Sequence, residues 1–112
     1  MSYAGSIDST AFPRLALTEA ARPDRIITVR GILTIGRDDD NDIVLDELTV
    51  SRYHAVLLSD ADGLQVIDLQ STNGTLVNGV PVPPDEPLRL NDEDLIQFGG
   101  VLARYSAGPG LH

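Results

Sequence analysis

The 112-residue sequence contains no cysteine, no tryptophan and no lysine. Without cysteine the chain forms neither disulfides nor a reactive thiolate, and a reducing compartment is its expected environment. The chain does not begin with a basic segment followed by an apolar one, and no apolar run approaches the length of a membrane span. We therefore expect a soluble cytoplasmic protein that does not interact with membranes.

Basic residues are also few, since 8 of them stand against 17 acidic residues and the formal net charge is −9. Such a surface repels nucleic acid, and no basic stripe with interleaved aromatic residues offsets the repulsion. Every cation is an arginine. Its planar guanidinium suits bidentate phosphate binding, although a lysine-free composition equally reflects a GC-rich genome. The composition thus argues against a nucleic-acid partner.

Apolar residues come in short runs separated by turn signals, and no helical period is sustained. At this length, a chain with 42% hydrophobic residues is one domain that buries a substantial core. We predict an all-β fold, a β-sandwich of two mostly antiparallel sheets with about 10–11 short strands. The sandwich is expected at residues 13–106, between flexible tails at residues 1–12 and 107–112.

Two tight turns are predicted at Asp62-Gly63 and Asn78-Gly79, because both dipeptides supply positive φ angles for hairpins. Residues 13–20 are compatible with an edge strand or with a helical turn, and both alternatives stay open. The remaining strands are expected at residues 25–30, 31–35, 43–45, 54–59, 64–69, 75–77, 88–90, 95–98 and 101–105.

Short polar motifs stand at the ends of predicted strands, where loops on a rigid scaffold concentrate binding residues. Their side chains are rich in hydrogen-bond donors, which suits a tetrahedral oxyanion better than a reaction centre. In this order and spacing the motifs resemble the forkhead-associated (FHA) domain, a reader of phosphothreonine peptides, from about Ile26 to Tyr105. The motifs are Gly36-Arg37, Ser51-Arg52-Tyr53-His54, Ser71-Thr72-Asn73-Gly74 and Asn78-Gly79.

The resemblance implies a phosphopeptide site without a catalytic residue, metal or cofactor. In it Arg37 grips the phosphate, Ser51 donates its hydroxyl, and Arg52 contributes through its backbone or side chain. Thr72 faces the phosphate, and Asn73 hydrogen-bonds the peptide main chain, since an amide both donates and accepts. Residues expected to support the site structurally are Gly36, His54, Asp68, Ser71, Gly74 and Asn78.

Plainer interpretations compete with these roles. Arg37 alone is compatible with a surface ion pair to neighbouring Asp38. Ser51 alone is compatible with a turn hydroxyl, and Asn73-Gly74 alone indicates only a turn. The agreement of all four motifs favours the phosphate site. For His54 we favour the structural role, in which the imidazole supports the binding loop.

Other functions fit the sequence less well. Asp38, Asp40 and Asp42 resemble the start of a calcium loop, but Ile43 and Thr49 replace the glycine and glutamate that the loop needs. The sequence has two histidines and no cysteine, a composition that argues against a zinc site. No nucleophile elbow surrounds Ser51, so we expect no enzyme. The alternative function is a structural or oligomerising module that binds its partner independently of phosphate.

The expected partner is a threonine-phosphorylated protein, either a Ser/Thr kinase or a kinase substrate. Thr49 stands two residues before Ser51, where family members that select an acidic peptide side chain can carry a basic residue. Repulsion by nearby carboxylates should disfavour acid-rich peptides. These carboxylates belong to Asp38, Asp39, Asp40, Asp42, Asp46 and Glu47.

Overall fold

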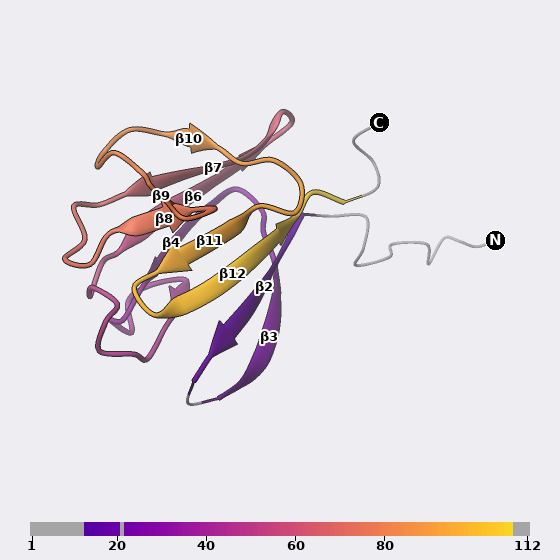
Figure 1. The fold of residues 1–112 in the computed structure, drawn as a ribbon. Helices are drawn as coiled ribbons and strands as arrows, with labels where there is room; N and C mark the ends of the chain where they lie inside the picture. The colour runs from indigo at the N-terminus through magenta and orange to yellow at the C-terminus, as the bar shows by residue number, and fades with distance from the viewer. Residues whose placement is uncertain (1–12, 21, 109–112) are drawn as a thin grey trace.

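The computed structural model describes residues 13–20 and 22–108, and their regular structure consists of short β-strands (Figure 1). The predicted N-terminal tail and residues 109–112 lie outside this described part. The strands are β2 (Arg14–Glu19), β3 (Arg22–Thr28), β4 (Ile32–Gly36), β5 (Ile43–Val44), β6 (Ala55–Asp60), β7 (Gly63–Asp68), β8 (Thr75–Val77), β9 (Val80–Pro81), β10 (Leu88–Arg89), β11 (Leu95–Phe98) and β12 (Val101–Ser106).

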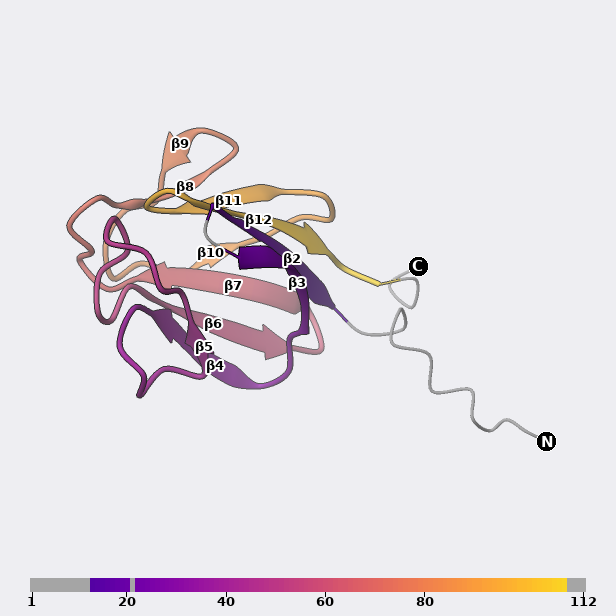
Figure 2. The same cartoon turned by 90° about the horizontal axis from the view of Figure 1, so that it is seen from below.

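Two sheets pack face to face, which confirms the predicted β-sandwich (Figure 2). The five-stranded sheet has the order β10-β7-β6-β4-β5, and the six-stranded sheet has the order β3-β2-β12-β11-β8-β9. Among these strand pairs only β4 and β5 run parallel. In residues 13–20 and 22–108 we find no helix with the length and apolar character required to cross a membrane.

Residues 14–19 form a strand, which confirms the strand alternative, but the strand is an inner one, so its expected edge position and the helical turn are wrong. β2 lies between β3 and β12, and Ala16 faces Ile26 on one side and Arg104 on the other. Leu15 and Leu17 alternate with exposed residues and are fully buried. This period of two places both leucines on the inner face of the sheet, and β3 takes the edge instead.

The two predicted turns differ in detail. Asn78 and Gly79 both have positive φ, at 51° and 82°, as the two-residue turn between β8 and β9 requires. Between β6 and β7, however, Asp60 pairs with Gly63. Ala61 and Asp62 therefore form that turn, and Gly63 begins β7 with a φ of 121°.

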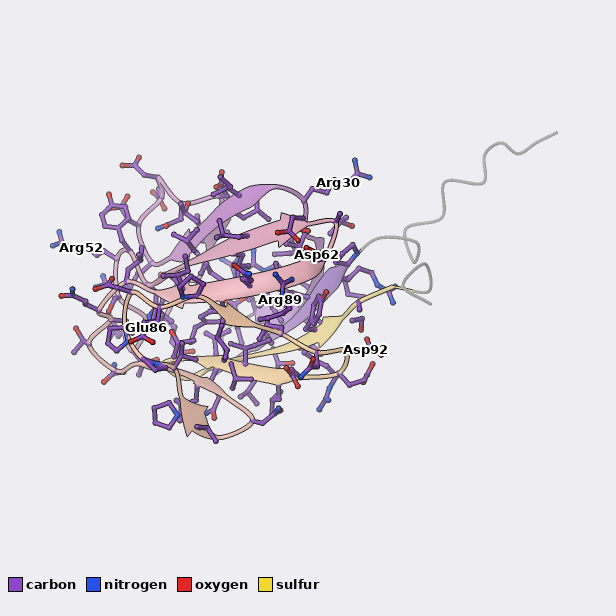
Figure 3. The ribbon with its side chains drawn as sticks, turned by 90° about the horizontal axis from the view of Figure 1, so that it is seen from above. Arg30, Arg52, Asp62, Glu86, Arg89 and Asp92 are labelled. Carbon is purple, nitrogen blue, oxygen red and sulfur yellow. The ribbon has the colours of Figure 1, made fainter. Side chains whose placement is uncertain are left out.

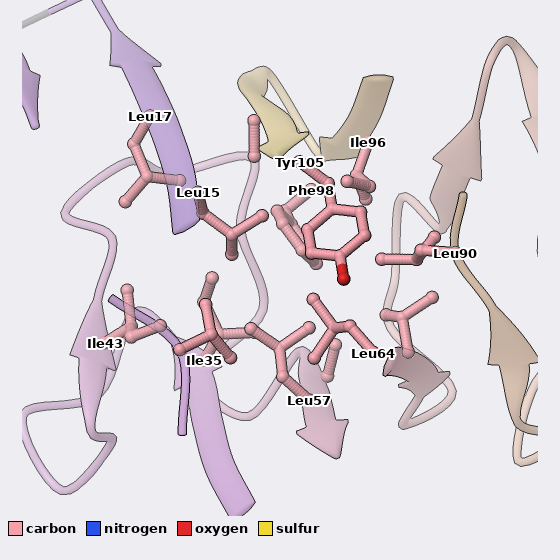
Figure 4. Close-up of a cluster of buried hydrophobic side chains, with 14 of the residues drawn as sticks. Leu15, Leu17, Ile35, Ile43, Leu57, Leu64, Leu90, Ile96, Phe98 and Tyr105 are labelled. Carbon is pink, nitrogen blue, oxygen red and sulfur yellow. The ribbon is translucent and has the colours of Figure 1, made fainter. Parts of the chain in front are cut away.

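The core fills the space between the two sheets with aliphatic side chains and two aromatic ones (Figure 4). Leu15, Ile35, Leu57, Phe98 and Tyr105 are each 1% exposed or less. Burying a side chain of this size stabilises the fold by roughly 1.5–3 kcal/mol, so the core holds the strands firmly. The connections between strands can therefore carry polar residues at little risk to the fold.

The polar connections gather at opposite ends of the sandwich. We call one the loop end, which contains residues 37–42, 45–54, 69–74 and 99–100. The other is the turn end, which contains residues 61–62, 78–79 and 91–94. Figure 3 shows Arg52 at the loop end, with Asp62 and Asp92 at the turn end.

Candidate functional site

A glycine allows two loops to meet at the loop end. Gly36 ends β4, and a Cβ atom there would lie only 2.3 Å from the carbonyl oxygen of Arg52. The next backbone N–H groups donate across the contact, from Arg37 to the Ser51 oxygen at 2.9 Å and from Asp38 to the Arg52 oxygen at 3.1 Å. No other residue fits such an approach, and it brings Arg37 beside Ser51.

The guanidinium of Arg37 is held on one side only. Its Nε donates to the carbonyl oxygen of Val50 at 3.0 Å. Its two amino groups make no hydrogen bond or ion pair with any residue that the structure describes, so the competing pair with Asp38 does not form. A half-buried guanidinium oriented through Nε presents both amino groups to a ligand, and two parallel donors match two oxygens of one phosphate.

Ser51 connects the 45–54 loop to the 69–74 loop. Its Oγ accepts a hydrogen bond from the backbone N–H of Thr72 at 2.9 Å. The hydroxyl proton consequently remains to donate to a ligand, since a serine hydroxyl has one donor and two acceptor positions. The exposed side chain of Thr72 makes no described hydrogen bond itself. Neither hydroxyl group thus has an acceptor for its proton among the described residues.

The side-chain amide of Asn73 reaches across to the same loop. Its Nδ2 donates to the carbonyl oxygen of Thr49 at 2.7 Å, although the residue as a whole is exposed. Its Oδ1 makes no hydrogen bond with the described residues. An amide fixed in this way offers a free acceptor and a second N–H donor to a passing peptide backbone.

His54 joins the two loops from beneath and is fully buried. Its Nδ1 accepts a hydrogen bond from the Ser51 N–H at 3.1 Å, so Nε2 carries the proton and donates to the Gly74 oxygen at 3.0 Å. Burial lowers the pKa of the imidazole below its ordinary value, against the opposing effects of the Gly74 carbonyl and the Asp68 charge. The neutral ring also packs edge-on against Phe98, with centroids 5.8 Å apart.

Asp68 fixes the start of the 69–74 loop, as the sequence predicts. Its buried carboxylate accepts the Ser71 N–H at 3.1 Å, the Ser71 hydroxyl at 2.5 Å and the Thr75 hydroxyl at 2.6 Å. Because these three donors surround one side chain, the loop that carries Thr72 and Asn73 has a defined position.

Two further side chains position the site and were not predicted. Asn41 is buried, and its Nδ2 donates to the Asp38 oxygen at 2.8 Å and to the Arg52 oxygen at 2.7 Å. Thr49 accepts the Gly100 N–H on Oγ1 at 2.8 Å, and its carbonyl oxygen lies where a Cβ atom on Gly99 would be 2.4 Å away. The Gly-Gly dipeptide was the only sequence signal for this contact.

Two predicted side chains lie apart from the central contacts. The side chain of Arg52 extends into solvent and pairs with no described residue (Figure 3). Asn78 lies at the turn end, where its Nδ2 donates to Asp94 at 2.9 Å and its Oδ1 accepts the Leu95 N–H at 3.0 Å. The structure thus gives Asn78 a role in the β8–β9 turn and no contact with the loop end.

The chemistry of this arrangement is recognition. A serine nucleophile requires a base at its hydroxyl, but His54 binds the backbone N–H of Ser51 and both of its ring nitrogens are occupied. In the described ranges no group of three or more histidine, aspartate and glutamate side chains could hold a metal ion. The donors of Arg37 and Ser51 and the amide of Asn73 match a phosphate group on an extended peptide.

Comparison with known proteins identifies the fold and the family. The family model of the FHA domain matches residues 33–99, which is more than half of the chain. The FHA domain of CT664 from Chlamydia trachomatis aligns with 84% of this chain and 95% of its own length, at a TM-score of 0.75 and 22% identity. A structure from an analysis of phosphothreonine-dependent FHA domain interactions aligns with 87% of this chain and 97% of its own length, at a TM-score of 0.73 and 31% identity.

Curated relatives include regulators. The glycogen accumulation regulator GarA of Mycobacterium tuberculosis is 36% identical over 76% of this chain and 51% of its own length. The oxoglutarate dehydrogenase inhibitor of Corynebacterium efficiens is 41% identical over 68% of this chain and 51% of its own length. An ATP-binding/permease transporter protein of M. tuberculosis is 38% identical over 70% of this chain and 9% of its own length. The chain thus spans about half or less of these relatives.

Proposed function

Since the chain belongs to the FHA domain family, we propose that it is a phosphothreonine-dependent binding module that recruits kinase-phosphorylated proteins. The observation that carries the proposal is the state of Arg37. Its guanidinium is oriented through Nε, and its two amino groups are left without a partner among the described residues. Its backbone N–H donates to the backbone oxygen of Ser51, so the two residues are adjacent. The family membership and the regulatory relatives identify a recognition module rather than an enzyme.

Each predicted residue has a distinct role in the proposal. Arg37 binds two phosphate oxygens, and the Ser51 hydroxyl donates to a phosphate oxygen. Arg52 and the Thr72 hydroxyl approach the phosphate from its solvent side. Asn73 holds the peptide main chain with its free Oδ1 and its second Nδ2–H.

The partner in this proposal is a Ser/Thr kinase or one of its substrates. Threonine is phosphorylated by kinases that use ATP, so the proposed place of action is the cytoplasm. The absence of cysteine agrees with that reducing compartment. A structural or oligomerising module is the second candidate, and it differs by binding its partner equally well without phosphate.

The experiment is a titration of the purified chain with matched phosphothreonine, phosphoserine, phosphotyrosine and unmodified peptides. The phosphothreonine peptide should bind most tightly, because its γ-methyl restricts χ1 and adds about 0.8 kcal/mol of apolar contact if buried. Phosphotyrosine should bind poorly, since its phosphate lies too far from the main chain that Asn73 holds.

The same samples separate binding from catalysis. The phosphopeptide should be recovered intact, because neither ring nitrogen of His54 is free to act as a base. Equal affinity for the unmodified peptide would support the structural module instead. Phosphate release that Ser51→Ala abolishes would show an enzyme.

A further inference from the structure

A cavity at the turn end has no role in the contacts described above. Its volume is about 320 Å³, at the lower end of the range of roughly 300–1,000 Å³ that is typical of pockets for small molecules. It lies at the opposite end of the sandwich from the proposed phosphopeptide site (Figure 3). The lining residues that decide its chemistry are Asp62, Arg89, Leu90, Asp92, Tyr105 and Ala107.

Tyr105 brings an unpaired polar group to this cavity. The residue is 1% exposed, and its buried hydroxyl group makes no hydrogen bond with any residue that the structure describes. Figure 4 shows the hydroxyl oxygen on the side of the ring that faces Leu64 and Leu90, and Leu90 is itself a lining residue. Buried hydroxyl groups nearly always have a hydrogen-bond partner, so an unpaired one in the wall of a cavity is an argument for a ligand.

The charges around the cavity are mainly negative. Nη1 of Arg89 donates to the backbone oxygen of Asp62 at 2.9 Å and lies 3.9 Å from an Asp60 carboxylate oxygen, which offsets the arginine charge. The side-chain carboxylates of Asp62 and Asp92 form no ion pair with any described residue. Two unpaired carboxylates raise the local concentration of cations and repel anions.

The carboxylate of Asp92 has a fixed position and a free oxygen. Its Oδ1 accepts the Ala107 N–H at 2.8 Å, and its Oδ2 makes no described hydrogen bond. Burial raises the pKa of the Tyr105 phenol, the charge of Asp92 raises it further, and the charge of Arg89 lowers it. Both charges therefore lie close enough to act on this hydroxyl. The phenol stays neutral at pH 7, and its oxygen can accept a hydrogen bond from a ligand N–H.

The lining suits an organic cation better than a metal ion. Within residues 13–20 and 22–108, no three carboxylate or histidine side chains converge in the way that metal binding requires. Leu90 and Ala107 are 5% and 9% exposed and supply an apolar wall beside the carboxylates. An ammonium group on a small hydrocarbon matches both parts of this lining, because its charge meets a carboxylate and its hydrocarbon meets the apolar wall.

We propose that the turn-end cavity binds a small primary amine in its ammonium form, with Asp92 and the Tyr105 hydroxyl as acceptors and Leu90 against the hydrocarbon. The proposal goes beyond phosphothreonine binding and does not depend on it. The two ends of the sandwich then bind ligands of opposite charge. Because Asp92 is exposed, amine binding should weaken as the salt concentration rises.

The test is an NMR titration of the whole chain at pH 7 with benzylamine, and with benzyl alcohol and benzoate as its neutral and anionic analogues. Benzylamine should shift the amide signals of the lining residues and bind about tenfold more tightly than either analogue. Asp92→Asn should weaken benzylamine binding about threefold to tenfold, because the amide oxygen still accepts the Ala107 N–H but the charge is lost. Asp24→Asn is the matched control, since it removes an exposed carboxylate from the edge strand β3 and should keep the affinity.

Tyr105→Phe separates a binding role from a hydroxyl that is merely unpaired. The variant removes one acceptor, so benzylamine affinity should fall about threefold. Its stability should be equal to or higher than that of the wild type, because an unpaired buried hydroxyl is lost. The variant therefore folds and tests the site independently of any disturbance that Asp92→Asn causes. A saturating phosphothreonine peptide should not displace benzylamine from the wild-type protein.

Each other outcome overturns the proposal. Benzylamine that does not bind at millimolar concentration, or that binds no better than benzyl alcohol, leaves no ammonium site. An unchanged affinity in Asp92→Asn or in Tyr105→Phe removes the assigned contacts. An equal loss in Asp24→Asn would show attraction to the net charge of −9 rather than to the cavity. Displacement by the phosphopeptide would locate the amine at the loop end.

Discussion

The two ends of the sandwich use arginine differently. At the turn end, Arg89 Nη1 donates to the Asp62 oxygen at 2.9 Å and lies 3.9 Å from an Asp60 carboxylate oxygen. Arg104 Nη1 donates to the Glu93 oxygen at 3.0 Å. At the loop end, the amino groups of Arg37 have no partner in the described residues. Arginine therefore closes turns at one end and is kept available at the other.

The carboxylates are hydrogen-bonded at both ends, but they differ in burial. At the loop end, buried Asp68 accepts hydrogen bonds from three donors and fixes the position of the 69–74 loop. At the turn end, Asp94 accepts hydrogen bonds from Asn78 and Asn91 near the surface. The loop end thus differs from the turn end in two ways. Its proposed phosphate donors have no partner among the described residues, and a loop beside them is fixed by a buried carboxylate whose hydrogen bonds are complete.

The largest expected effect is on stability, from Asp68→Asn. The new amide NH₂ group would face the N–H and hydroxyl donors of Ser71 and Thr75. One of these buried donors would then have no acceptor, so the free energy of unfolding should fall by about 3 kcal/mol. Chemical denaturation measures the loss. Asp94→Asn is the control at the turn end, with an expected loss of about 1 kcal/mol or less. Equal losses would break the comparison between the two ends.

The next effect is on affinity, from Arg37→Ala. Hydrogen bonds to charged groups contribute roughly 1.5–3 kcal/mol, so phosphopeptide affinity should fall about tenfold or more while the fold remains intact. Arg37→Lys should restore only part, because an ammonium lacks the bidentate geometry. Calorimetric titration measures both variants. Arg89→Ala should keep the wild-type affinity, and a comparable loss there would show that the phosphate does not bind at the loop end.

A smaller effect depends on pH and concerns His54. Its folded-state pKa lies below the unfolded value of about 6.5, so above that pH the ring is neutral in both states and its stabilising contribution is complete. As the pH falls below about 6.5, the unfolded chain binds a proton first and stability declines, by up to about 1.4 kcal/mol per pH unit, until the folded pKa is reached.

Denaturation between about pH 7 and 5.5 tests this, because few carboxylates titrate there. His112→Gln is the control for the second histidine and should keep the slope. An NMR titration of the His54 ring reports its pKa directly, without a variant that disturbs the core. A folded-state pKa at or above the unfolded value would contradict the expected direction.

The smallest expected effect comes from the charge of the 37–42 loop, which is rich in aspartate and lies beside the site. Phosphothreonine peptides with basic flanks should bind a few-fold more tightly than acid-flanked ones, and the difference should shrink at high salt. Asp39→Asn should reduce the difference, since Asp39 is exposed at the loop end. Asp62→Asn removes an exposed charge from the turn end and should leave the affinity difference between the two kinds of peptide unchanged. Titrations at two salt concentrations decide between these outcomes.

Local signals in the sequence predicted most strands and turns. Short apolar runs on both sides of Asp62-Gly63 marked β6 and β7, and Asn78-Gly79 marked a turn whose φ angles are both positive. The same local signal misled for residues 13–20, because a strand's pattern does not reveal which neighbours it pairs with. β2 proved to be an inner strand because β3 folds back along it and takes the edge.

The site was predicted as a set of residues, and its internal contacts were not. The bond from Asn73 to Thr49 joins residues 24 apart, and the bond from Gly100 to Thr49 joins residues 51 apart. Such contacts arise from the stacking of two sheets, so no local periodicity reports them. The positions of Asn41 and Thr49 therefore required the structure.

Two backbone contacts at the loop end are too close to admit a methyl group, Gly36 against Arg52 and Gly99 against Thr49. Loops packed this tightly on the sheets have already lost their conformational entropy during folding. When a peptide binds these loops, the loss of conformational entropy therefore comes almost entirely from the peptide and very little from the protein. Peptides of equal charge but different sequence should then associate at similar rates and differ mainly in how long they remain bound.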